Sequence, residues 1–400
     1  MLTRRFALCA GVATLAGLAP AMAQRRGPKT HGPAGDLTPP SPAQTPIGPV
    51  DTTAKWAFIT DFNTGAELLD KNADERMPPS SMTKLMTLYI VYSRLQKGQL
   101  KLTDMLTVSE KAWRMGGSRM FLQVGTQASV EDLIRGIEVA SGNDACIVLA
   151  EAISGSEEQF ANLMNETGKQ LGLTNSHFMN STGWPADDHY MSCRDIATLA
   201  GDIIRSFPEY YHYAGEKTFR YDNIEQQNRN PLVQRGTADG LKTGHTDAGG
   251  YGLVASTLRG TRRVILVLNG MATMRERSEE SERLVDWAFA NFEDVTLFTA
   301  EQAVENAPVW LGESATVSLV GGKDIVLTMP RNWRHVAKVE VSYDSPVRAP
   351  VMKGTKLGMV TVSGQGVPNM QVPLVAGATV PRLGLPGRAV AVLAHYVGGV

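Results

Sequence analysis

The sequence predicts an α+β fold in which an antiparallel sheet with a cluster of helices is followed by a small all-β domain. Apolar and polar residues alternate on both sides of the Asn63-Thr64-Gly65 turn, a pattern typical of a β-hairpin. A second strand pair is predicted at 251–268, around the Gly260-Thr261 turn. Past residue 297, short β-prone runs separated by Gly, Pro, Asn or Asp indicate the all-β domain.

Helical patterns fill the sequence between the two strand pairs. The segment 81–91 has strong apolar content, and Ser129, Ser156 and Ser192 each precede an apolar periodic run with the spacing of a capping box. After the second strand pair, the segment 279–292 is predicted to be one amphipathic helix. The β-prone runs of the second domain are 317–320, 325–329, 336–341 and 357–362.

The composition excludes several classes of protein. The chain has 39 Lys+Arg against 40 Asp+Glu, a formal net charge of −1, whereas a nucleic-acid binder needs a basic surface to neutralise phosphates. Hydrophobic residues at 43% and charged residues at 20% are typical of a globular rather than a disordered chain. Three cysteines cannot form a disulfide scaffold, and no Cys/His cluster has zinc spacing. We therefore expect no nucleic-acid partner, no metal and no cofactor.

The N-terminal segment carries an export signal. Residues 1–23 have the pattern of a signal peptide, with Arg4 and Arg5 before an apolar stretch and an Ala21-Met22-Ala23 cleavage signal. The next segment, 24–50, is so rich in proline that it is expected to form an extended linker rather than a helix or a sheet. The mature protein is therefore expected to work outside the cytoplasm.

Three short motifs follow one another in a fixed order. They are Ser81-Met82-Thr83-Lys84, Ser141-Gly142-Asn143 and Lys242-Thr243-Gly244. Each motif alone is uninformative, because such short strings occur by chance in long chains. All three in this order, each in its expected structural context, are typical of the serine acyl-transferases that include penicillin-binding proteins and β-lactamases.

The spacing of the first motif has a chemical reason. Positions i and i+3 of a helix face the same way, so Ser81 Oγ and Lys84 Nζ are expected within hydrogen-bond reach. A serine hydroxyl is a weak nucleophile until a base takes its proton. Lysine is a base only when it is neutral, so its pKa must fall from about 10.4. Partial burial, the helix N-terminus and a second cation all lower it, and Lys242 is the candidate cation.

The other motif residues are assigned to proton transfer and substrate binding. Ser141 is expected to pass the proton from Lys84 towards the leaving amine, and Asn143 to hold both the substrate carbonyl and Lys84. The backbone N–H groups of Ser81 and His245 are the expected oxyanion hole. The residues expected at the terminal carboxylate of the substrate are Lys242 and Thr243, with Gly244 beside them.

Longer stretches around these motifs resemble the low-molecular-mass penicillin-binding proteins that act as D-alanyl-D-alanine carboxypeptidases. The matching stretches are 79–84, 133–136, 141–146, 228–230 and 239–246. The resemblance implies a periplasmic serine enzyme that removes the terminal D-alanine from a peptidoglycan pentapeptide through an acyl-enzyme on Ser81. It also implies that β-lactams acylate and inhibit the enzyme. The resemblance further implies a β-lactamase/transpeptidase-like catalytic domain, placed at 51–297, before a β-sandwich domain at 298–380.

In the same family an arginine after the strand pair binds the substrate carboxylate. Alignment without gaps from Lys242 puts Arg277 at this position, with Arg275 as a nearby alternative. Family members also commonly end in an amphipathic helix at the membrane surface. In the tail of this chain, 381–400, the sequence is compatible with a short apolar helix at 388–397, but Gly384, Pro386 and Gly387 interrupt its approach, so contact with the inner membrane stays open.

Two alternative functions remain beside the carboxypeptidase. A β-lactamase needs a carboxylate that activates water for fast deacylation, and no E-x-x-L-N stretch lies between Ser141 and Lys242. A catalytically silent cell-wall binding protein is disfavoured because Ser81, Lys84 and Lys242 are intact. Two of the cysteines, Cys146 and Cys193, lie in helical stretches and are expected to be free, buried thiols.

Overall fold

The computed structural model describes residues 41–398, so the predicted signal peptide at 1–23 and most of the predicted linker lie outside the described residues. A five-stranded antiparallel sheet forms the centre of the first domain, with the strand order β2-β1-β9-β8-β7. Its strands are β1 (Trp56–Asp61), β2 (Glu67–Lys71), β7 (Gly240–Thr246), β8 (Gly250–Arg259) and β9 (Arg262–Met271). Both strand pairs predicted from the sequence are therefore present in one sheet.

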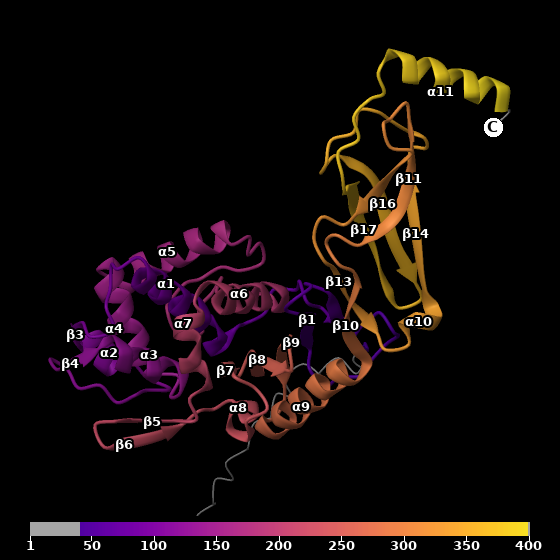
Figure 1. Cartoon of the computed structure of the whole chain (residues 1–400). Coiled ribbons are helices and arrows are strands. Elements are labelled where there is room, and N and C mark those ends of the chain that lie inside the picture. Colours follow the sequence, from indigo (N-terminus) through magenta and orange to yellow (C-terminus); the bar gives the residue numbers. More distant parts are fainter. Residues whose placement is uncertain (1–40, 399–400) are drawn as a thin grey trace, which may run out of the picture. The chain divides into compact units, whose positions relative to one another are not determined.

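A cluster of helices covers one face of this sheet (Figure 1). The cluster contains α1 (Lys84–Gln96), α2 (Glu110–Arg114), α3 (Val130–Glu138), α4 (Asn143–Ser154), α5 (Glu157–Gln170), α6 (Cys193–Ser206) and α7 (Pro208–Tyr211). The side chains of Ser129, Ser156 and Ser192 each accept a hydrogen bond from the backbone N–H three residues later, which confirms the predicted N-caps. Of these helices, α6 packs against β1 and β9.

The opposite face of the sheet is covered by α9 (Met274–Asn291), which contacts β8 and β9 and follows the short helix α8 (Pro231–Arg235). Successive side chains of β9 lie on opposite faces of the sheet. Val267 packs in the core on the side of the helical cluster, whereas Leu266 and Leu268 pack in the core on the side of α9. The helix α9 begins five residues before the predicted start at 279, because the side chain of Thr273 caps it by accepting from the backbone N–H of Glu276.

Two single-turn helices and two small hairpins complete the first domain. The helices are η1 (Ser80–Thr83) and η2 (His212–Gly215). Two small hairpins pair β3 (Met105–Thr107) with β4 (Gln127–Ser129) and β5 (Thr218–Tyr221) with β6 (Ile224–Gln227). The turn η1 packs against both β7 and β8, so the start of α1 meets the edge of the sheet.

The rest of the described chain is mainly β-structure. A six-stranded sheet has the order β14-β16-β17-β12-β11-β15, and β10 pairs with β13. The apolar core of this part of the chain contains residues of the six-stranded sheet, such as Leu374, and of the β10–β13 pair, such as Leu327. The predicted α+β class with a second, all-β domain is confirmed. The elements are β10 (Phe292–Phe298), β11 (Ala303–Trp310), β12 (Thr316–Val320), β13 (Ile325–Pro330), α10 (Trp333–Val336), β14 (Ala337–Tyr343), β15 (Val347–Arg348), β16 (Lys356–Gly364) and β17 (Val367–Ala376).

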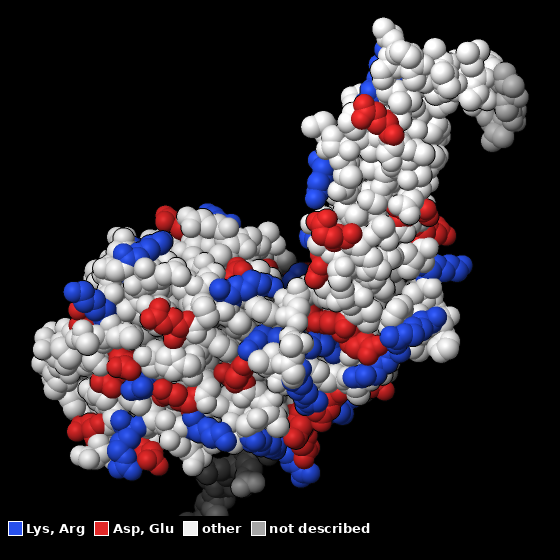
Figure 2. Space-filling view, viewed as in Figure 1, with Lys and Arg blue, Asp and Glu red and all other residues white. Residues whose placement is uncertain are grey.

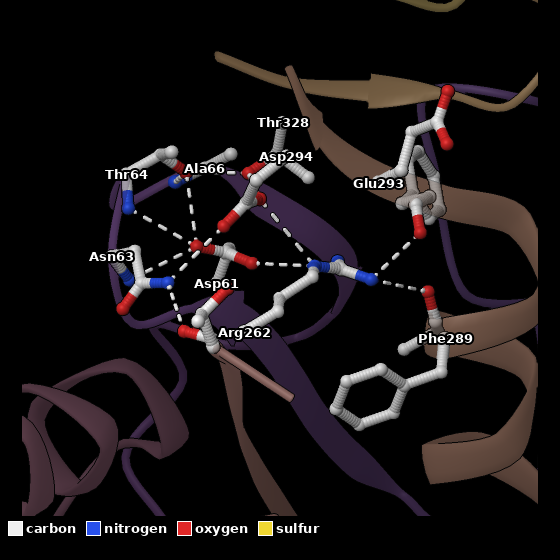
Figure 3. A network of polar contacts seen from close by, with 12 residues as sticks. Asp61, Asn63, Thr64, Ala66, Arg262, Phe289, Glu293, Asp294 and Thr328 are labelled. Carbon is white, nitrogen blue, oxygen red and sulfur yellow. Dashed lines mark hydrogen bonds and ion pairs between the residues drawn. The ribbon is translucent and has the colours of Figure 1, made fainter. Parts of the chain in front are cut away.

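A polar network connects the β1–β2 turn and β9 to β10 and β13 (Figure 3). Arg262 Nε lies 2.8 Å from Asp61 Oδ2 and 3.4 Å from Asp294 Oδ1. Asn63 donates to Asp294 over 3.2 Å, and the hydroxyls of Thr64 and Thr328 lie 2.6 Å apart. The network is buried, because Asp61 is fully enclosed and the side chain of Arg262 is only 10% exposed. It therefore ties these two sets of strands together.

The C-terminal tail forms one helix, α11 (Leu385–Gly398), which contains the short apolar helix expected at 388–397 and begins directly after Gly384. The expectation that Pro386 and Gly387 interrupt the approach to the helix was wrong, because both lie inside it. Pro386 lies in the first turn, where the missing N–H has no intrahelical acceptor to lose. Figure 2 shows acidic and basic side chains interspersed on the visible face, whereas the visible part of α11 is largely uncharged. Among residues 41–398, no helix combines the length and apolar character needed to cross a bilayer.

Candidate active site

The hydroxyl of Ser81 and the amine of Lys84 lie next to each other at the start of α1. Ser81 is part of the turn η1, and Lys84 is the first residue of α1. Lys84 Nζ lies 2.8 Å from Ser81 Oγ, as expected for side chains one helical turn apart. Lys84 is fully buried, whereas Ser81 lines an open cleft. The hydroxyl therefore has a potential base beside it and access to a substrate.

A loop from α5 to α6 holds the amine of Lys84 in place. Lys84 Nζ donates a second hydrogen bond of 2.7 Å to the carbonyl oxygen of Thr182. Asn180 Oδ1 fixes this loop by accepting from the backbone N–H groups of Thr182 and Gly183. Gly183 has a φ of +81°, and a Cβ there would lie 1.8 Å from the carbonyl oxygen of Ser80. Only glycine allows the loop to approach the nucleophile so closely.

The environment of Lys84 favours its neutral form. Both of its hydrogen-bond acceptors, a hydroxyl and a carbonyl, are uncharged. Burial and, after it, repulsion by Arg229 lower the pKa of Lys84 to about 8. At pH 7 about a tenth of this lysine is therefore unprotonated, and this neutral form is the state that a general base requires.

The second lysine, Lys242, lies on β7 and shares the buried pocket. Burial and repulsion by Lys84 lower the pKa of Lys242. Two ammonium groups in one pocket repel each other, so the protonation of either lysine disfavours that of the other. Gly244 lets β7 lie close to η1, because a Cβ at this position would be 3.0 Å from the carbonyl oxygen of Pro79.

Ser141 lies between α3 and α4, and Asn143 is the first residue of α4. Ser141 has a φ of +59°, and its buried hydroxyl has no hydrogen-bond partner among residues 41–398. The side-chain amide of Asn143 donates a hydrogen bond of 2.8 Å to the carbonyl oxygen of Gly116 and so fixes the segment before Gly117 and Ser118. Part of the Asn143 amide is therefore used to hold this segment in place.

A cavity of about 540 Å³ on one side of Ser81 is basic. Arg277 is buried beside it, with its guanidinium 5.7 Å from the centre of the Tyr251 ring, and burial lowers the pKa of Arg277 to about 10. Arg275, the alternative, has a largely exposed side chain paired with Glu279 at 2.7 Å. The cavity is lined by Ser81, Ser118, Ser141, Gln227, Asn228, Arg229, Thr243, Gly244, His245, Tyr251, Met274 and Arg277.

A second cavity of about 280 Å³ also reaches Ser81. Its walls include Asn143, Trp184 and Asp247 and carry no arginine or lysine. The ring of Trp184 lies against the Gly116–Gly117 backbone, where a Cβ on Gly117 would be 3.0 Å from it. The nucleophile therefore stands between a basic cavity and one without basic residues, which suits a substrate with a negative charge on one side only.

Comparison with known proteins identifies the family to which the chain belongs. Residues 42–273 match the family model described as D-alanyl-D-alanine carboxypeptidase, and residues 292–382 match that of the penicillin-binding protein 5 C-terminal domain. The chain belongs to the D-alanyl-D-alanine carboxypeptidase family. The resemblance seen in the sequence is therefore confirmed, and the protein is a serine D,D-carboxypeptidase.

Individual relatives cover most of the chain. The D-alanyl-D-alanine carboxypeptidase DacA of Escherichia coli strain K12 is 38% identical over 340 residues, which are 82% of this chain and 84% of that protein. The structure of penicillin-binding protein 5 from Haemophilus influenzae is similar with a TM-score of 0.74 and 38% identity, covering 84% of this chain and all of that one. Penicillin-binding protein D2 from Listeria monocytogenes, in an ampicillin-bound form, has a TM-score of 0.55 and 27% identity, covering 60% of this chain and 98% of that one.

Several residues of this carboxypeptidase site were not assigned from the sequence. Arg229 donates to the Ser118 hydroxyl across the basic cavity, Tyr251 packs its ring 3.9 Å from that of His245, and Trp184 forms the wall of the second cavity. For Arg229 the sequence does contain an indication, namely the asparagine on each side of it in Asn228-Arg229-Asn230. In the structure, the side chains of both asparagines accept hydrogen bonds from nearby backbone N–H groups and so fix the backbone around the arginine. The sequence around Tyr251 and Trp184 contains no comparable pattern that would indicate a place in the active site.

Proposed function

We propose that Ser81 is the nucleophile that removes the terminal D-alanine from a peptidoglycan pentapeptide. Lys84 takes the hydroxyl proton as Ser81 Oγ forms a bond to the carbonyl carbon of the penultimate D-alanine. The C–N bond then breaks, and the D-alanine amine leaves with a proton supplied by Lys84 through the Ser141 hydroxyl. Water subsequently cleaves the ester and restores Ser81. The observation that carries this proposal is the 2.8 Å contact between a fully buried lysine and an accessible serine.

The terminal carboxylate of the substrate is proposed to enter the basic cavity. Arg277 lines the cavity and supplies positive charge, and the Thr243 hydroxyl supplies a donor. Lys242 precedes Thr243 on β7 but is buried and does not line the cavity, so we propose that its charge acts from behind the wall. The backbone N–H groups of Ser81 and His245 form the proposed oxyanion hole, because η1 packs against the edge strand β7. The unpartnered hydroxyl of Ser141 supports a role in proton transfer, since it can bond to the leaving amine without losing a partner.

We further propose that β-lactams acylate Ser81 and so inhibit the enzyme. The test is mass spectrometry of the intact protein after brief exposure to penicillin, followed by peptide mapping of the adduct. We expect one adduct on Ser81, none in Ser81→Ala, and an unchanged adduct in the control Ser80→Ala. The same variants are then assayed for D-alanine release from a pentapeptide. An adduct on Ser81→Ala would disprove the assignment, and rapid loss of the wild-type adduct would favour the β-lactamase alternative.

The protein is proposed to act in the periplasm, at the surface of the inner membrane. The cleavage pattern in 1–23 supports export, and a mature protein that begins at Gln24 by mass spectrometry is the expected result. The exposed apolar residues of α11 support a peripheral membrane contact, since Val390, Leu393 and Tyr396 are 67%, 64% and 82% exposed. Arg388 adds a positive charge to this helix.

The membrane contact has its own experiment. The full chain is mixed with phosphatidylglycerol vesicles and sedimented, in parallel with Leu393→Glu. The control is Val339→Glu, which adds the same charge at an exposed apolar position on β14. We expect the wild type and Val339→Glu to sediment with the vesicles and Leu393→Glu to stay in solution. Equal behaviour of all three proteins would rule out α11 as the contact.

A further inference from the structure

A cavity of about 750 Å³ lies in the second domain, and none of the active-site residues lines it. Its walls come from the end of β11, from β15 and the loop before it, from the start of β16, and from α11. The charged, aromatic and apolar side chains in these walls include Trp310, Asp344, Arg348, Lys356, Leu357 and His395. The reaction proposed for Ser81 uses none of these residues, so the cavity is available to another ligand.

The helix α11 is fixed beside this cavity at two points. Before the helix, the backbone N–H of Leu383 donates a hydrogen bond of 2.9 Å to the carbonyl oxygen of Leu311. Within the helix, the His395 ring meets the Trp310 ring edge to face, with 5.0 Å between the ring centres. Trp310 is the register partner of Arg348 in the parallel pair β11–β15, so these two side chains lie on the same face of the sheet. An imidazole, an indole and a guanidinium are therefore held around one space.

The walls of the cavity carry an excess of positive charge. Arg348 and Lys356 are exposed cations, and Asp344 is the one carboxylate in the walls, which leaves one positive charge without compensation. Within the described part of the second domain, ion pairs are formed by other cations, namely Arg331, Arg334 and Lys353. The guanidinium of Arg348 and the ammonium of Lys356 are therefore available to an anion.

The chemistry of the walls favours a phosphodiester over other anions. Guanidinium and ammonium groups are the side chains that bind phosphate oxygens most often. A phosphodiester carries one negative charge, which matches the excess in the cavity, whereas a phosphate monoester carries up to two near neutral pH. Trp310 and Leu357 add an apolar wall beside the cations, and the Asp344 carboxylate can accept hydrogen bonds from hydroxyl groups. A phosphodiester that joins a polyol to an apolar part satisfies all three features.

The side of α11 that faces the cavity is opposite its exposed apolar side. Val390 and Leu393 are exposed and three residues apart, so they share one side of the helix. His395 follows Leu393 by two residues, a rotation of about 200° around the helix. A helix in a membrane surface buries its apolar side ~5–10 Å into the boundary between headgroups and acyl chains, and an α-helix is about 10 Å wide. With Val390 and Leu393 in this boundary, the cavity lies at the level of the headgroup phosphates.

We propose that this cavity binds the phosphodiester headgroup of phosphatidylglycerol. Arg348 and Lys356 bind the phosphate oxygens, Asp344 accepts from the hydroxyls of the headgroup glycerol, and Trp310 and Leu357 pack against the carbons that follow the phosphate. The inference rests on the proposed membrane contact of α11, because that contact brings the cavity to the headgroups. It goes beyond that contact, because the β domain would then recognise one kind of lipid rather than any apolar surface.

The test is a calorimetric titration of the full chain with dihexanoyl phosphatidylglycerol, kept below the concentration at which it forms micelles. The wild type should bind this lipid, and dihexanoyl phosphatidylcholine, which has no net charge, should bind at least about tenfold more weakly. The double variant Arg348→Gln and Lys356→Gln should lose ~10–100-fold in affinity, since each hydrogen bond to a charged group contributes about tenfold or more. Glycerol 1-phosphate should also bind more weakly than the lipid, because it has no apolar part.

The matched control is the double variant Lys353→Gln and Arg382→Gln. Both residues are exposed at the same end of the domain, where isolated bridges join Gly312 to Arg382 and Val351 to Val380, but neither lines the cavity. This control removes the same amount of charge and should bind the lipid as the wild type does. Penicillin acylation should be unchanged in both double variants, which shows that each of them is folded.

The outcomes separate the headgroup site from the membrane contact. If the wild type sediments with vesicles but binds no monomeric phosphatidylglycerol, the contact through α11 stands and the headgroup site is refuted. An equal loss of affinity in the two double variants would also refute the site, because it would reduce the effect to overall charge. If glycerol 1-phosphate bound as tightly as the lipid, the cavity would serve a soluble phosphate and not a membrane. The variant Leu393→Glu should leave the vesicles yet still bind the monomeric lipid, and loss of both properties would overturn a separate headgroup site.

Discussion

Two buried carboxylates, Asp61 at the polar network and Glu138 behind the active site, differ in how completely they are satisfied. Asp61 accepts from the backbone N–H groups of Asn63 and Thr64, from the Thr64 hydroxyl and from Arg262 Nε, at distances of 2.8 to 3.2 Å. Among residues 41–398, Glu138 accepts a single hydrogen bond, from Tyr92. For both groups, burial is the largest of the effects that raise the pKa.

This difference separates a structural from a functional use of a buried charge. Every oxygen of Asp61 has a donor, so the charge holds the β1–β2 turn and Arg262 in one arrangement and has nothing left to offer. Glu138 keeps an oxygen that has no donor among residues 41–398, and its charge and that of Lys242 affect each other's ionisation. Changes at the first region should therefore alter stability, and changes at the second should alter rates and their pH dependence.

The largest expected effect is on the rate of acylation in Lys84→Ala. Loss of the base should slow penicillin acylation by ~10²–10⁴-fold, the usual contribution of a general base. The matched control is Lys71→Ala, because Lys71 is also a buried lysine but donates to the Thr52 carbonyl far along the sheet. Stopped-flow measurement with a fluorescent penicillin gives both rates. A rate for Lys84→Ala within a few fold of the wild type would require another base.

The same measurement on the wild type tests the protonation state of Lys84. Its pKa is lowered to about 8, so the neutral base form is lost as the pH falls below this value. The acylation rate should therefore fall about tenfold for each pH unit below the pKa and level off above it. A rate that stays constant between pH 8 and pH 6 would contradict a lysine base.

At the polar network, Arg262→Ala should mainly reduce stability. It leaves Asp61 buried without its cation, which usually costs about 3–5 kcal/mol. Urea denaturation measures the loss of free energy of unfolding, and the acylation rate at low temperature should stay near the wild-type value. The comparison variant is Arg262→Met combined with Asp61→Asn, which removes both charges and should cost less than the single change. A stable Arg262→Ala protein would show that the network does not hold these strands together.

Local signals in the sequence predicted the fold and the first motif well. The caps at Ser129 and Ser156 and the hairpin at Asn63-Thr64-Gly65 depend on neighbouring residues alone, and the structure contains all of them. The contact between Ser81 and Lys84 also follows from helix geometry. The C-terminal helix begins earlier than expected, because Pro386 and Gly387 were weighed as helix breakers without regard to their place in the first turn.

Contacts between distant residues could not be predicted. The acceptor that orients Lys84 is the carbonyl of Thr182, 98 residues away, and Asp61 is 201 residues from Arg262. The burial of Glu138 likewise depends on distant parts of the chain, since its carboxylate accepts from Tyr92, 46 residues away. A glutamate at the end of an amphipathic helix usually faces water, so its sequence context gave no sign that it is buried.

A smaller effect is expected for Arg277→Ala, which removes one cation from the basic cavity. A hydrogen bond to a charged group contributes about 1.5–3 kcal/mol, so kcat/KM for a peptide with a free terminal carboxylate should fall ~10–100-fold. The control is Arg275→Ala, because that side chain is exposed and paired with Glu279. The loss should largely disappear for a peptide whose C-terminus is amidated. An equal loss for both peptides would place Arg277 in a structural rather than a binding role.

The smallest effect is expected for Cys146→Ala, which tests whether this thiol acts on the two lysines as an anion. The ionisation of Cys146 is coupled to Lys84 and Lys242, but burial raises the pKa of its thiol to about 12, so it carries no charge over the working range. Its removal should therefore leave the pH profile of acylation where it is in the wild type, and circular dichroism confirms the fold. If the profile of Cys146→Ala moved by about one pH unit or more, Cys146 would be present as a thiolate, and the neutral thiol inferred from its burial would be wrong.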